Sequence, residues 1–385
     1  MQRGADAMSN ILMISADRSV VAGERGPFYY MLETFARHWE RVDVIGTRPE
    51  RVVSLQPFPN VHLHHPTSGK LAQAGFIART GRRLCAERPY AVMTSHDYNP
   101  FYNGWGAWRI ARATGTPWIA EIHHVPGHPR AANLRERVDR RVTRHYVRWA
   151  ARRATGIRVV NATELPALLT GWGVPASRIH VLPSLYLDLQ AFRPDGPVDA
   201  RTDLLLVGRL VPNKGAAQVV AAVGRLWARG LRPTLRFVGR GPERARLERL
   251  ARALRIEQAI SFTDWLPDAA ALAAAYRGAR CLVIASTSEG GPRVGAEAMA
   301  CGTPVVSTRV GIMAVLVRDG RNGVLYDGST AELTLRLQRL LTDARQESAL
   351  RAELPGDLSA YRREMVIARL AEGLRAAAAG GPPSR

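Results

Sequence analysis

Short apolar runs alternate with longer amphipathic segments along almost the whole chain of 385 residues. In the first half, the runs Ile11–Ser15, Val42–Gly46 and Trp118–Ile122 have the character of strands, and Pro27–Glu40 has that of a helix. Such alternation is typical of right-handed βαβ units, in which helices connect parallel strands and cover the sheet. The pattern therefore predicts an α/β fold with doubly wound parallel sheets.

A second series of strand-like runs follows a break at Ala191–Arg201, where two prolines and a glycine fit a linker. We expect an N-terminal domain at 1–190, a linker at 191–201 and a second domain at 202–356. A C-terminal helix within 357–385 is expected to pack back on the first domain and to end in a frayed tail. The strands expected in the second domain are Asp203–Gly208, Thr234–Gly239, Ile260–Thr263, Cys281–Ala285, Pro304–Thr308 and Gly323–Tyr326.

The composition is that of a globular enzyme, with 46% hydrophobic and 23% charged residues. Three widely spaced cysteines fit neither a disulfide framework nor a zinc cluster. No apolar run reaches the roughly 18 residues that a membrane span needs, and the polar start Met1–Asn10 does not resemble a secretory signal. These features predict a cytoplasmic protein.

The formal net charge of +21 restricts the partners of the chain. Only two of its 54 basic residues are lysines, Lys70 and Lys214. An excess of this size attracts polyanions, anionic lipid surfaces and phosphorylated substrates. The charge alone does not select among these partners.

The segment 288–308, SEGGPRVGAEAMACGTPVVST, carries the strongest local signal. Glycines and a proline exclude a helix directly after Glu289, and an apolar-periodic helix then runs from Arg293 to a capping glycine, Gly302. Glu289 therefore lies on a loop and Glu297 on the first turns of a helix. Free N–H groups at a helix start favour phosphate or sugar oxygens, and a carboxylate suits vicinal hydroxyls. From the residues alone, a capping glutamate beside a solvated one is the alternative interpretation.

A second signal is the segment 207–215, VGRLVPNKG, in which a strand ends at Gly208. Arg209, Lys214 and the start of the next helix follow, and such a cluster can hold a diphosphate without a metal. Because the chain otherwise uses arginine, the retained Lys214 favours a point charge over a guanidinium fork. The alternative interpretation is a solvated basic loop.

Three other motifs are weaker. The glycine turns AGERGP (22–27) and FVGRGP (237–242) match neither a dinucleotide-binding nor a Walker motif. His62, His64 and His65 have no acidic or cysteine neighbour in the sequence, which favours a polar strand with a turn over a metal site.

In combination and in this order, the segments resemble the retaining GT-B glycosyltransferases that carry the E-x7-E motif (family four, group 1). They cover most of the C-terminal half, whereas the N-terminal half matches only in layout. The resemblance implies two facing Rossmann-like, doubly wound parallel-sheet domains with an interdomain cleft. The matching segments are Glu289–Glu297, EAMACGTPVVST, GRLVPNKG, VGRGPE and RDGRNGVLYD at Arg318–Asp327.

The resemblance also implies residue roles. Arg209 and Lys214 would bind the donor diphosphate and stabilise the leaving group. Glu297 would accept hydrogen bonds from ribose hydroxyls, and Glu289 would hold the transferred sugar. His123 matches a histidine near the reaction centre, with His124 as its alternative. The catalytic candidates are His123, Arg209, Lys214 and Glu289, and the further donor-binding candidates are Gly23, Gly26, Gly239, Trp265, Leu266, Gly290, Gly291, Pro292, Arg293, Val294 and Glu297.

The chain departs from the family pattern at three places, the first of which is the N-terminal loop at 22–27, which lacks a Gly-Gly pair. Leu182–Asp188 reads LPSLYLD where the family usually has Asn-Gly-Val-Asp after Leu-Pro, and Gly291 replaces a large residue. No D-x-D motif occurs in the chain, so the aspartate–metal clamp of other glycosyltransferases is missing. We therefore expect no essential metal and no cofactor besides the nucleotide-sugar co-substrate.

Two features of the N-terminal half concern the acceptor. Asp97–Trp108 places five aromatic residues near a helix start, where they can stack on a sugar or pack in the core. Asp97, Tyr98 and His124 are the acceptor candidates.

Arg130–Arg153 is an expected helix with nine arginines. It is either a surface helix packed on its domain or a basic amphipathic helix that docks on anionic lipid. Both interpretations rest on one apolar stripe, formed by Leu134, Val138, Val142, Tyr146 and Trp149.

We predict a retaining, metal-independent glycosyltransferase of the hexosyltransferase type. It would move a sugar from a nucleotide-sugar donor to a saccharide or lipid-linked acceptor in cell-envelope polysaccharide or glycolipid biosynthesis, in the cytoplasm or on the inner face of the membrane. The alternatives are a GT-B nucleotide-sugar epimerase or hydrolase, and a basic nucleic-acid-binding protein. No motif for specific nucleic-acid recognition occurs in the chain.

Overall fold

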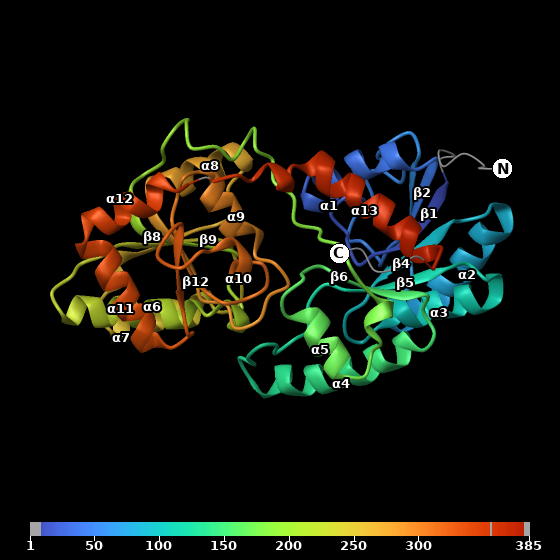
Figure 1. Ribbon diagram of the computed structural model, residues 1–385, viewed down its shortest axis with the longest axis horizontal. Coiled ribbons are helices and arrows are strands. Elements are labelled where there is room, and N and C mark those ends of the chain that lie inside the picture. Colours follow the sequence, from blue (N-terminus) through green and yellow to red (C-terminus); the bar gives the residue numbers. More distant parts are fainter. Residues whose placement is uncertain (1–8, 355, 381–385) are drawn as a thin grey trace. The chain divides into compact units, whose positions relative to one another are not determined.

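The computed structural model describes residues 9–354 and 356–380, and Figure 1 shows its elements. Contacts divide the chain into two compact units. Unit 1 comprises the described residues of 1–124, 141–184 and 363–385, and unit 2 comprises those of 125–140 and 185–362. The contacts thus group 125–140 with unit 2 and the C-terminal helix with unit 1.

Unit 1 is built on a seven-stranded parallel sheet with the order β3-β2-β1-β4-β5-β6-β7. Its central strands β1, β4 and β5 are almost entirely buried, as expected for a sheet covered on both faces. The strands are β1 (Asn10–Ile14), β2 (Arg41–Ile45), β3 (Val61–His64), β4 (Val92–His96), β5 (Trp118–Ile122), β6 (Gly156–Val159) and β7 (Ile179–Val181).

Four helices of unit 1 form two packed pairs. α2 packs on α3, and α1 packs on α13, which also contacts β4 and β5 (Figure 1). The buried face of α13 carries Val366, Ile367, Leu370 and Leu374, and Arg375 donates a hydrogen bond to the carbonyl of His38. The helices are α1 (Pro27–Phe35), α2 (Gln73–Glu87), α3 (Tyr102–Thr114), α5 (Leu165–Gly171) and α13 (Arg363–Ala378), together with α4 (Leu134–Ala151), which begins in unit 2.

The ends of two helices, α1 and α13, are compared with the sequence-based expectation. The helix expected at Pro27–Glu40 is shorter, because α1 ends at Phe35 and a 3-10 turn follows at Ala36–His38. The helix α13 continues to Ala378, and residues 381–385 of the expected frayed tail lie outside the described residues.

Unit 2 is built on a six-stranded parallel sheet with the order β10-β9-β8-β11-β12-β13. Its first strand is central and the chain winds outwards on both sides, which creates a topological switch point between β8 and β11. The strands are β8 (Thr202–Val207), β9 (Leu235–Val238), β10 (Ile260–Thr263), β11 (Ala279–Ile284), β12 (Val305–Thr308) and β13 (Gly323–Tyr326).

Alternation along β8 divides the interior of unit 2 into two cores. Leu204 and Leu206 pack with α6, α7 and α11, whereas Leu205 and Val207 pack with α8, α9 and α10. Successive side chains of a strand point to opposite faces, so one strand supplies both cores. The helices are α6 (Ala216–Ala228), α7 (Arg244–Ala253), α8 (Ala269–Gly278), α9 (Arg293–Ala300), α10 (Met313–Leu316), α11 (Thr330–Thr342) and α12 (Ala344–Ala352).

The segment 191–201 contains no helix or strand and is held against unit 2. Arg277 of α8 donates hydrogen bonds to the carbonyls of Arg193 and Pro197. In the described ranges, the helices lack the combination of length and apolar character that a membrane span requires.

Candidate active site

The carboxyl ends of β8 and β11 bring together the two strongest sequence signals in unit 2. Lys214 follows β8 and Glu289 follows β11, and the ammonium group of Lys214 contacts Oε1 of Glu289. The Ser286 hydroxyl donates to the same oxygen at 3.1 Å. The two charged side chains are 18% and 16% exposed, so solvent and a ligand can reach the pair.

A close approach of two loops creates this ion pair. The Asn213 amide donates to the Ser288 carbonyl at 3.0 Å, and the Thr287 N–H donates to the Asn213 carbonyl at 2.8 Å. Gly215 lies in the left-handed region (φ +68°), and a Cβ atom there would lie 2.1 Å from the Ala285 carbonyl oxygen. Only glycine permits both the turn and the contact at this position.

Arg209 directly follows Gly208 at the end of β8, and its side chain is exposed. Gly239, at the end of β9, has a φ of +138°, and a Cβ atom there would lie 2.1 Å from the Gly208 carbonyl oxygen. The predicted base region follows β10, where Trp265 is exposed and Leu266 packs against the core. Arg209, Gly239, Trp265 and Leu266 therefore follow three neighbouring strands, β8, β9 and β10, at the carboxyl edge of the sheet.

Glu297 lies in the second turn of α9 and is only 7% exposed. The Tyr276 hydroxyl of α8 donates to its Oε2 at 2.9 Å. Burial raises the pKa of Glu297, while Arg293 and the Tyr276 hydrogen bond act in the opposite direction. The carboxyl group of Glu297 is thus fixed by the buried hydroxyl of Tyr276, a residue that no sequence motif identifies.

The start of α9 has the predicted arrangement of a loop followed by a helix. Pro292 is the N-cap residue, the Arg293 guanidinium lies 4.3 Å from the centroid of the Tyr186 ring, and Val294 packs partly against the core. Gly291 is exposed, and an added Cβ atom would meet only Ile312, at 3.7 Å. The space beside Gly291 therefore tolerates a side chain.

The backbone of the neighbouring Gly290 packs closely against Gly311. A Cβ atom on Gly311 would lie 2.6 Å from the Gly290 carbonyl oxygen, so the loop after β12 closes on the loop after β11. The predicted C-cap, Gly302, follows α9 with a φ of +74°.

In unit 1, two histidines meet at the carboxyl ends of β4 and β5. The rings of His96 and His123 are stacked with centroids 4.1 Å apart, and Nε2 of His123 lies 3.1 Å from Oε2 of Glu121. His124 is exposed, and so is Tyr98, whose ring centroid lies 5.8 Å from that of His96. The roles of His123, His124 and Tyr98 stay predictions.

Asp97 lies in the interior of unit 1. Its carboxyl group accepts hydrogen bonds from the Ser95 hydroxyl at 3.1 Å and the Tyr146 hydroxyl at 2.6 Å. Burial raises the pKa of this carboxyl group well above its ordinary value. The structure thus places this acceptor candidate in the core of unit 1, and its role stays a prediction.

The glycine loop after β1 contains one constrained glycine. Gly23 has a φ of +80° and packs against Val53, whereas Gly26 is the extended N-cap residue of α1 with open space around it. Of these two predicted donor-loop glycines, only Gly23 needs the left-handed conformation.

Most of the aromatic segment 97–108 packs against α4. The Phe101 ring stacks on Tyr146 with centroids 4.0 Å apart, and the Trp105 ring lies 4.2 Å from that of Trp149. These contacts favour the packing interpretation of the aromatic residues over sugar stacking.

The predicted apolar stripe of α4 divides into two parts. Leu134, Val138 and Val142 are 73%, 50% and 41% exposed, whereas Tyr146 is buried and Trp149 partly so. The N-terminal turns of α4 therefore leave an apolar stripe in solvent, and the C-terminal turns pack on unit 1.

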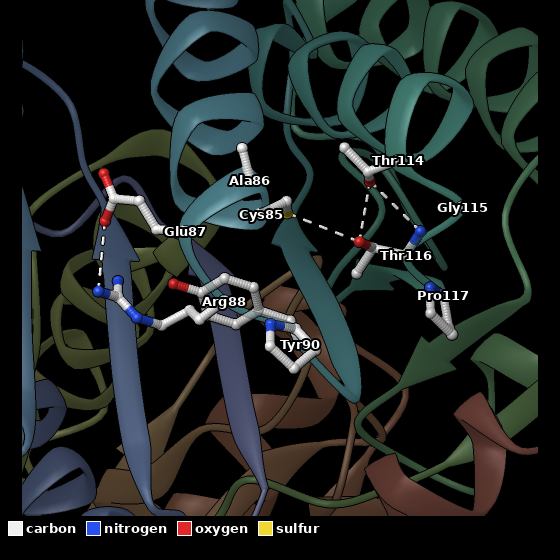
Figure 2. A pocket seen from close by; sticks show the side chains of 10 residues that line it. Cys85, Ala86, Glu87, Arg88, Tyr90, Thr114, Gly115, Thr116 and Pro117 are labelled. Carbon is white, nitrogen blue, oxygen red and sulfur yellow. Dashed lines mark hydrogen bonds and ion pairs between the residues drawn. The ribbon is translucent and has the colours of Figure 1, made fainter.

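A pocket lies at the opposite edge of the unit 1 sheet, before β4 and β5 (Figure 2). Cys85 and Thr116 approach each other across it at 3.6 Å. Ligands of parallel sheets bind at the carboxyl ends of the strands, and none of the predicted site residues lines this pocket.

Among the described residues, no group of three or more histidine, cysteine or acidic side chains could hold a metal ion. His62, His64 and His65 occupy strand β3 and the turn after it, as expected for a polar strand. His64 instead contacts the buried Asp43 at 2.7 Å.

Comparison with known proteins identifies the family. The family model described as "Glycosyl transferases group 1" matches residues 190–356, and "Glycosyl transferase 4-like domain" matches residues 19–184. A D-inositol 3-phosphate glycosyltransferase of Frankia alni is 35% identical over 336 residues, which is 81% of this chain and 80% of that protein. This chain belongs to the group 1 glycosyltransferases.

Other relatives of the same name align over a smaller part. In those of Acidothermus cellulolyticus, Rhodococcus jostii and Rhodococcus opacus, the matched part is 46%, 52% and 53% of the protein. The chain thus spans about half the length of these relatives.

Solved structures share the fold. Sucrose-phosphate synthase from Thermosynechococcus elongatus is 20% identical with a TM-score of 0.78, covering 94% of this chain and 98% of that one. Anabaena HepE in complex with UDP-glucose is 18% identical with a TM-score of 0.72, covering 95% and 99%. The GT-B fold predicted from the sequence is confirmed.

Proposed function

We propose that this chain is a retaining, metal-independent glycosyltransferase that moves a sugar from a nucleotide-sugar donor to a saccharide or lipid-linked acceptor. The observation that carries the proposal is the Lys214–Glu289 ion pair at the switch point of unit 2, with Arg209 exposed after the same strand as Lys214. Family membership supports it, as do the similar fold of Anabaena HepE in complex with UDP-glucose and the similarity to a D-inositol 3-phosphate glycosyltransferase.

The ion pair supplies both halves of a donor site. A diphosphate would draw the Lys214 ammonium away from Glu289, and the released carboxylate would accept hydrogen bonds from sugar hydroxyls. Lys214 and Arg209 would then stabilise the charge that develops on the leaving diphosphate, which is the task a metal ion performs elsewhere.

Retention follows from attack on the face that the leaving group occupies. The bond between the anomeric carbon and the phosphate oxygen breaks, the bond to the acceptor oxygen forms, and the acceptor proton passes to the departing diphosphate. No nucleophilic side chain is required in this scheme, so Glu289 acts as a binding residue.

A thermal-shift panel of UDP-, GDP- and ADP-sugars tests the donor site. At about 100 times its dissociation constant, the correct nucleotide sugar should stabilise the protein by roughly 2.7 kcal/mol. Lys214→Ala should lose most of this shift, whereas Lys70→Ala, which changes the only other lysine at an exposed position, should retain it.

Product analysis then distinguishes the reaction classes. Transfer to an added acceptor, with inositol phosphate and glycolipid mixtures as first choices, is expected to persist in a metal chelator. Release of a free or epimerised sugar without an acceptor would favour a hydrolase or an epimerase. No shift with any nucleotide would contradict the proposal.

We further propose that α4 brings the enzyme to anionic lipid, in keeping with a role in cell-envelope polysaccharide or glycolipid biosynthesis on the inner face of the membrane. The exposed Leu134, Val138 and Val142 form one stripe, and the exposed Arg137, Arg141, Arg144 and Arg148 lie beside it. Apolar side chains bordered by arginines match the interface of an anionic bilayer.

Flotation with vesicles tests this surface. Vesicles rich in phosphatidylglycerol should bind the protein at low salt, and phosphatidylcholine vesicles should not. Replacing Leu134 and Val138 with serine should weaken binding about tenfold, whereas Leu71→Ser, at a 92% exposed position elsewhere, should not. Equal binding to nucleic acid and to lipid, with the same salt dependence, would instead indicate a general polyanion surface.

A further inference from the structure

A buried ion pair in unit 1 includes the glutamate that contacts His123. Glu121 of β5 and Arg158 of β6 are register partners, and the Arg158 guanidinium donates to Oε1 of Glu121 at 2.8 Å. Their side chains are 6% and 4% exposed, and Nε of Arg158 also donates to the Leu182 carbonyl at 2.9 Å. The carboxylate is therefore fixed in position from within the sheet.

The second oxygen of this carboxylate contacts His123. Oε2 of Glu121 lies 3.1 Å from Nε2 of His123, and the side chain of His123 is partly exposed. Arg158 and His123 hold the pKa of Glu121 well below its ordinary value against the effect of burial, so the group is ionised and only accepts hydrogen bonds. Nε2 of His123 must therefore carry the proton that it donates.

This contact decides the chemistry of the other ring nitrogen. In the described part of the chain, Nδ1 of His123 forms no hydrogen bond, and it is not among the buried unpaired atoms. Because Arg158 already balances the charge of Glu121, the carboxylate does not require an imidazolium beside it. A neutral ring with a proton on Nε2 presents a lone pair at Nδ1.

His96 packs against the ring of His123. Its ring stacks on His123 with centroids 4.1 Å apart and an interplanar angle of 27°. Desolvation by burial lowers the pKa of His96 to about 3, so this neighbour is neutral. The ring of His123 is thus held between a fixed carboxylate and a neutral aromatic face.

We propose that Glu121, anchored by Arg158, is a positioning residue that fixes His123 as the Nε2–H tautomer and presents Nδ1 as a hydrogen-bond acceptor for a hydroxyl of the bound acceptor. The inference rests on the proposed glycosyltransferase function, because it assigns the ligand of His123. It adds two residues that no sequence motif marks.

Glu121→Gln tests the proposal with minimal change of shape. The amide oxygen must face Arg158, so the amide NH2 faces Nε2 of His123, which then has to accept. His123 would adopt the Nδ1–H tautomer and turn an acceptor into a donor. We expect kcat to fall about 10- to 100-fold, while KM for the active nucleotide sugar of the panel stays within about twofold.

Nitrogen-15 spectra of histidine-labelled protein read the tautomer directly, with His123→Ala to assign the signal. The wild type should show Nε2–H, and Glu121→Gln should show Nδ1–H. Combining Glu121→Gln with His123→Ala should be no slower than His123→Ala alone, because the carboxylate acts through the ring. An Nδ1–H signal in the wild type, or the same tautomer in both proteins, would overturn the proposal.

Unit 1 offers a matched control. Asp43 is fully buried and accepts hydrogen bonds from Arg41 and Tyr90, with His64 also 2.7 Å away. Asp43→Asn should lower stability and leave kcat unchanged. An equal loss of kcat in Asp43→Asn would show that Glu121 has only a structural role. If the wild type transfers no sugar, the proposed function fails, and the spectra still decide the tautomer.

Discussion

The two sheets hold a lysine or arginine against a glutamate in opposite ways. In unit 2, Lys214 and Glu289 meet in loops at the sheet edge, and both side chains are accessible. In unit 1, Arg158 and Glu121 meet between neighbouring strands, and both are buried. The two pairs are chemically similar and differ mainly in their access to solvent.

Accessibility determines what each pair can do. An anionic ligand can replace Glu289 as the partner of Lys214, because water and ligand reach both groups. No ligand reaches Arg158, and separating a buried pair leaves an uncompensated charge. The exposed pair is therefore suited to exchange partners during turnover, and the buried pair is suited to hold a third residue, His123, in one state.

The largest effect on stability is expected from Arg158→Ala. The substitution leaves the ionised Glu121 buried without its main partner, which should lower the free energy of unfolding by about 3–5 kcal/mol. Urea denaturation measures this loss, with the surface pair variant Arg83→Ala as the control. A loss below about 1 kcal/mol would remove the distinction between the two pairs.

Lys214→Ala should have the opposite profile. Because the pair with Glu289 is partly exposed, the free energy of unfolding should fall by less than about 1 kcal/mol. The value of kcat/KM should fall about 100- to 1000-fold, because the charge that we propose to stabilise the leaving group is lost. Steady-state kinetics and denaturation of the same sample test both statements, and a stability loss without a loss of rate would contradict them.

The smallest effect concerns Glu297, a buried carboxyl group that has no hydrogen-bonded cationic partner within the described ranges 9–354 and 356–380. Burial raises its pKa in the folded state, so the folded protein loses stability relative to Glu297→Gln as the pH rises above the ordinary value near 4.5. At pH 7 the variant should be more stable by about 1 kcal/mol, and near pH 4 the difference should vanish.

Urea denaturation at the two pH values measures this difference, and nucleotide-induced stabilisation should decrease in the same variant. If Glu297→Gln is the less stable protein at pH 7, the Tyr276 hydrogen bond outweighs the burial of the charge.

Much of the fold follows from local patterns in the sequence. Trp118–Ile122, Ile260–Thr263 and Gly323–Tyr326 form strands with the predicted bounds, because each is a short run rich in β-branched and aromatic residues. The helix Pro27–Glu40 is shorter than predicted, since periodicity does not show where a 3-10 turn replaces the last α-helical turn.

The residues of the candidate site likewise divide into those that local sequence patterns indicate and those that they do not. Lys214 and Glu289 lie in glycine-rich segments whose position after a strand is readable from the sequence, and the structure joins them. Glu121 and Arg158 are 37 residues apart, and only register connects them. Their signal was a single charge of opposite sign in each of two apolar runs. Asp97 directly follows His96, the last residue of β4. Its side chain nevertheless points into the core, because it accepts hydrogen bonds from Ser95 and Tyr146.

The packing of α13 on α1 has a consequence for biosynthesis. Residues 185–362 of unit 2 are nearly continuous in sequence, whereas unit 1 needs residues 363–378 to cover its first helix and two of its central strands. During translation, the earlier strands and helices of unit 1 must therefore wait for residues 363–378, which are made after residues 185–362 of unit 2, since such long-range contacts form slowly. Unit 2 can complete its core while unit 1 still exposes apolar surface to chaperones.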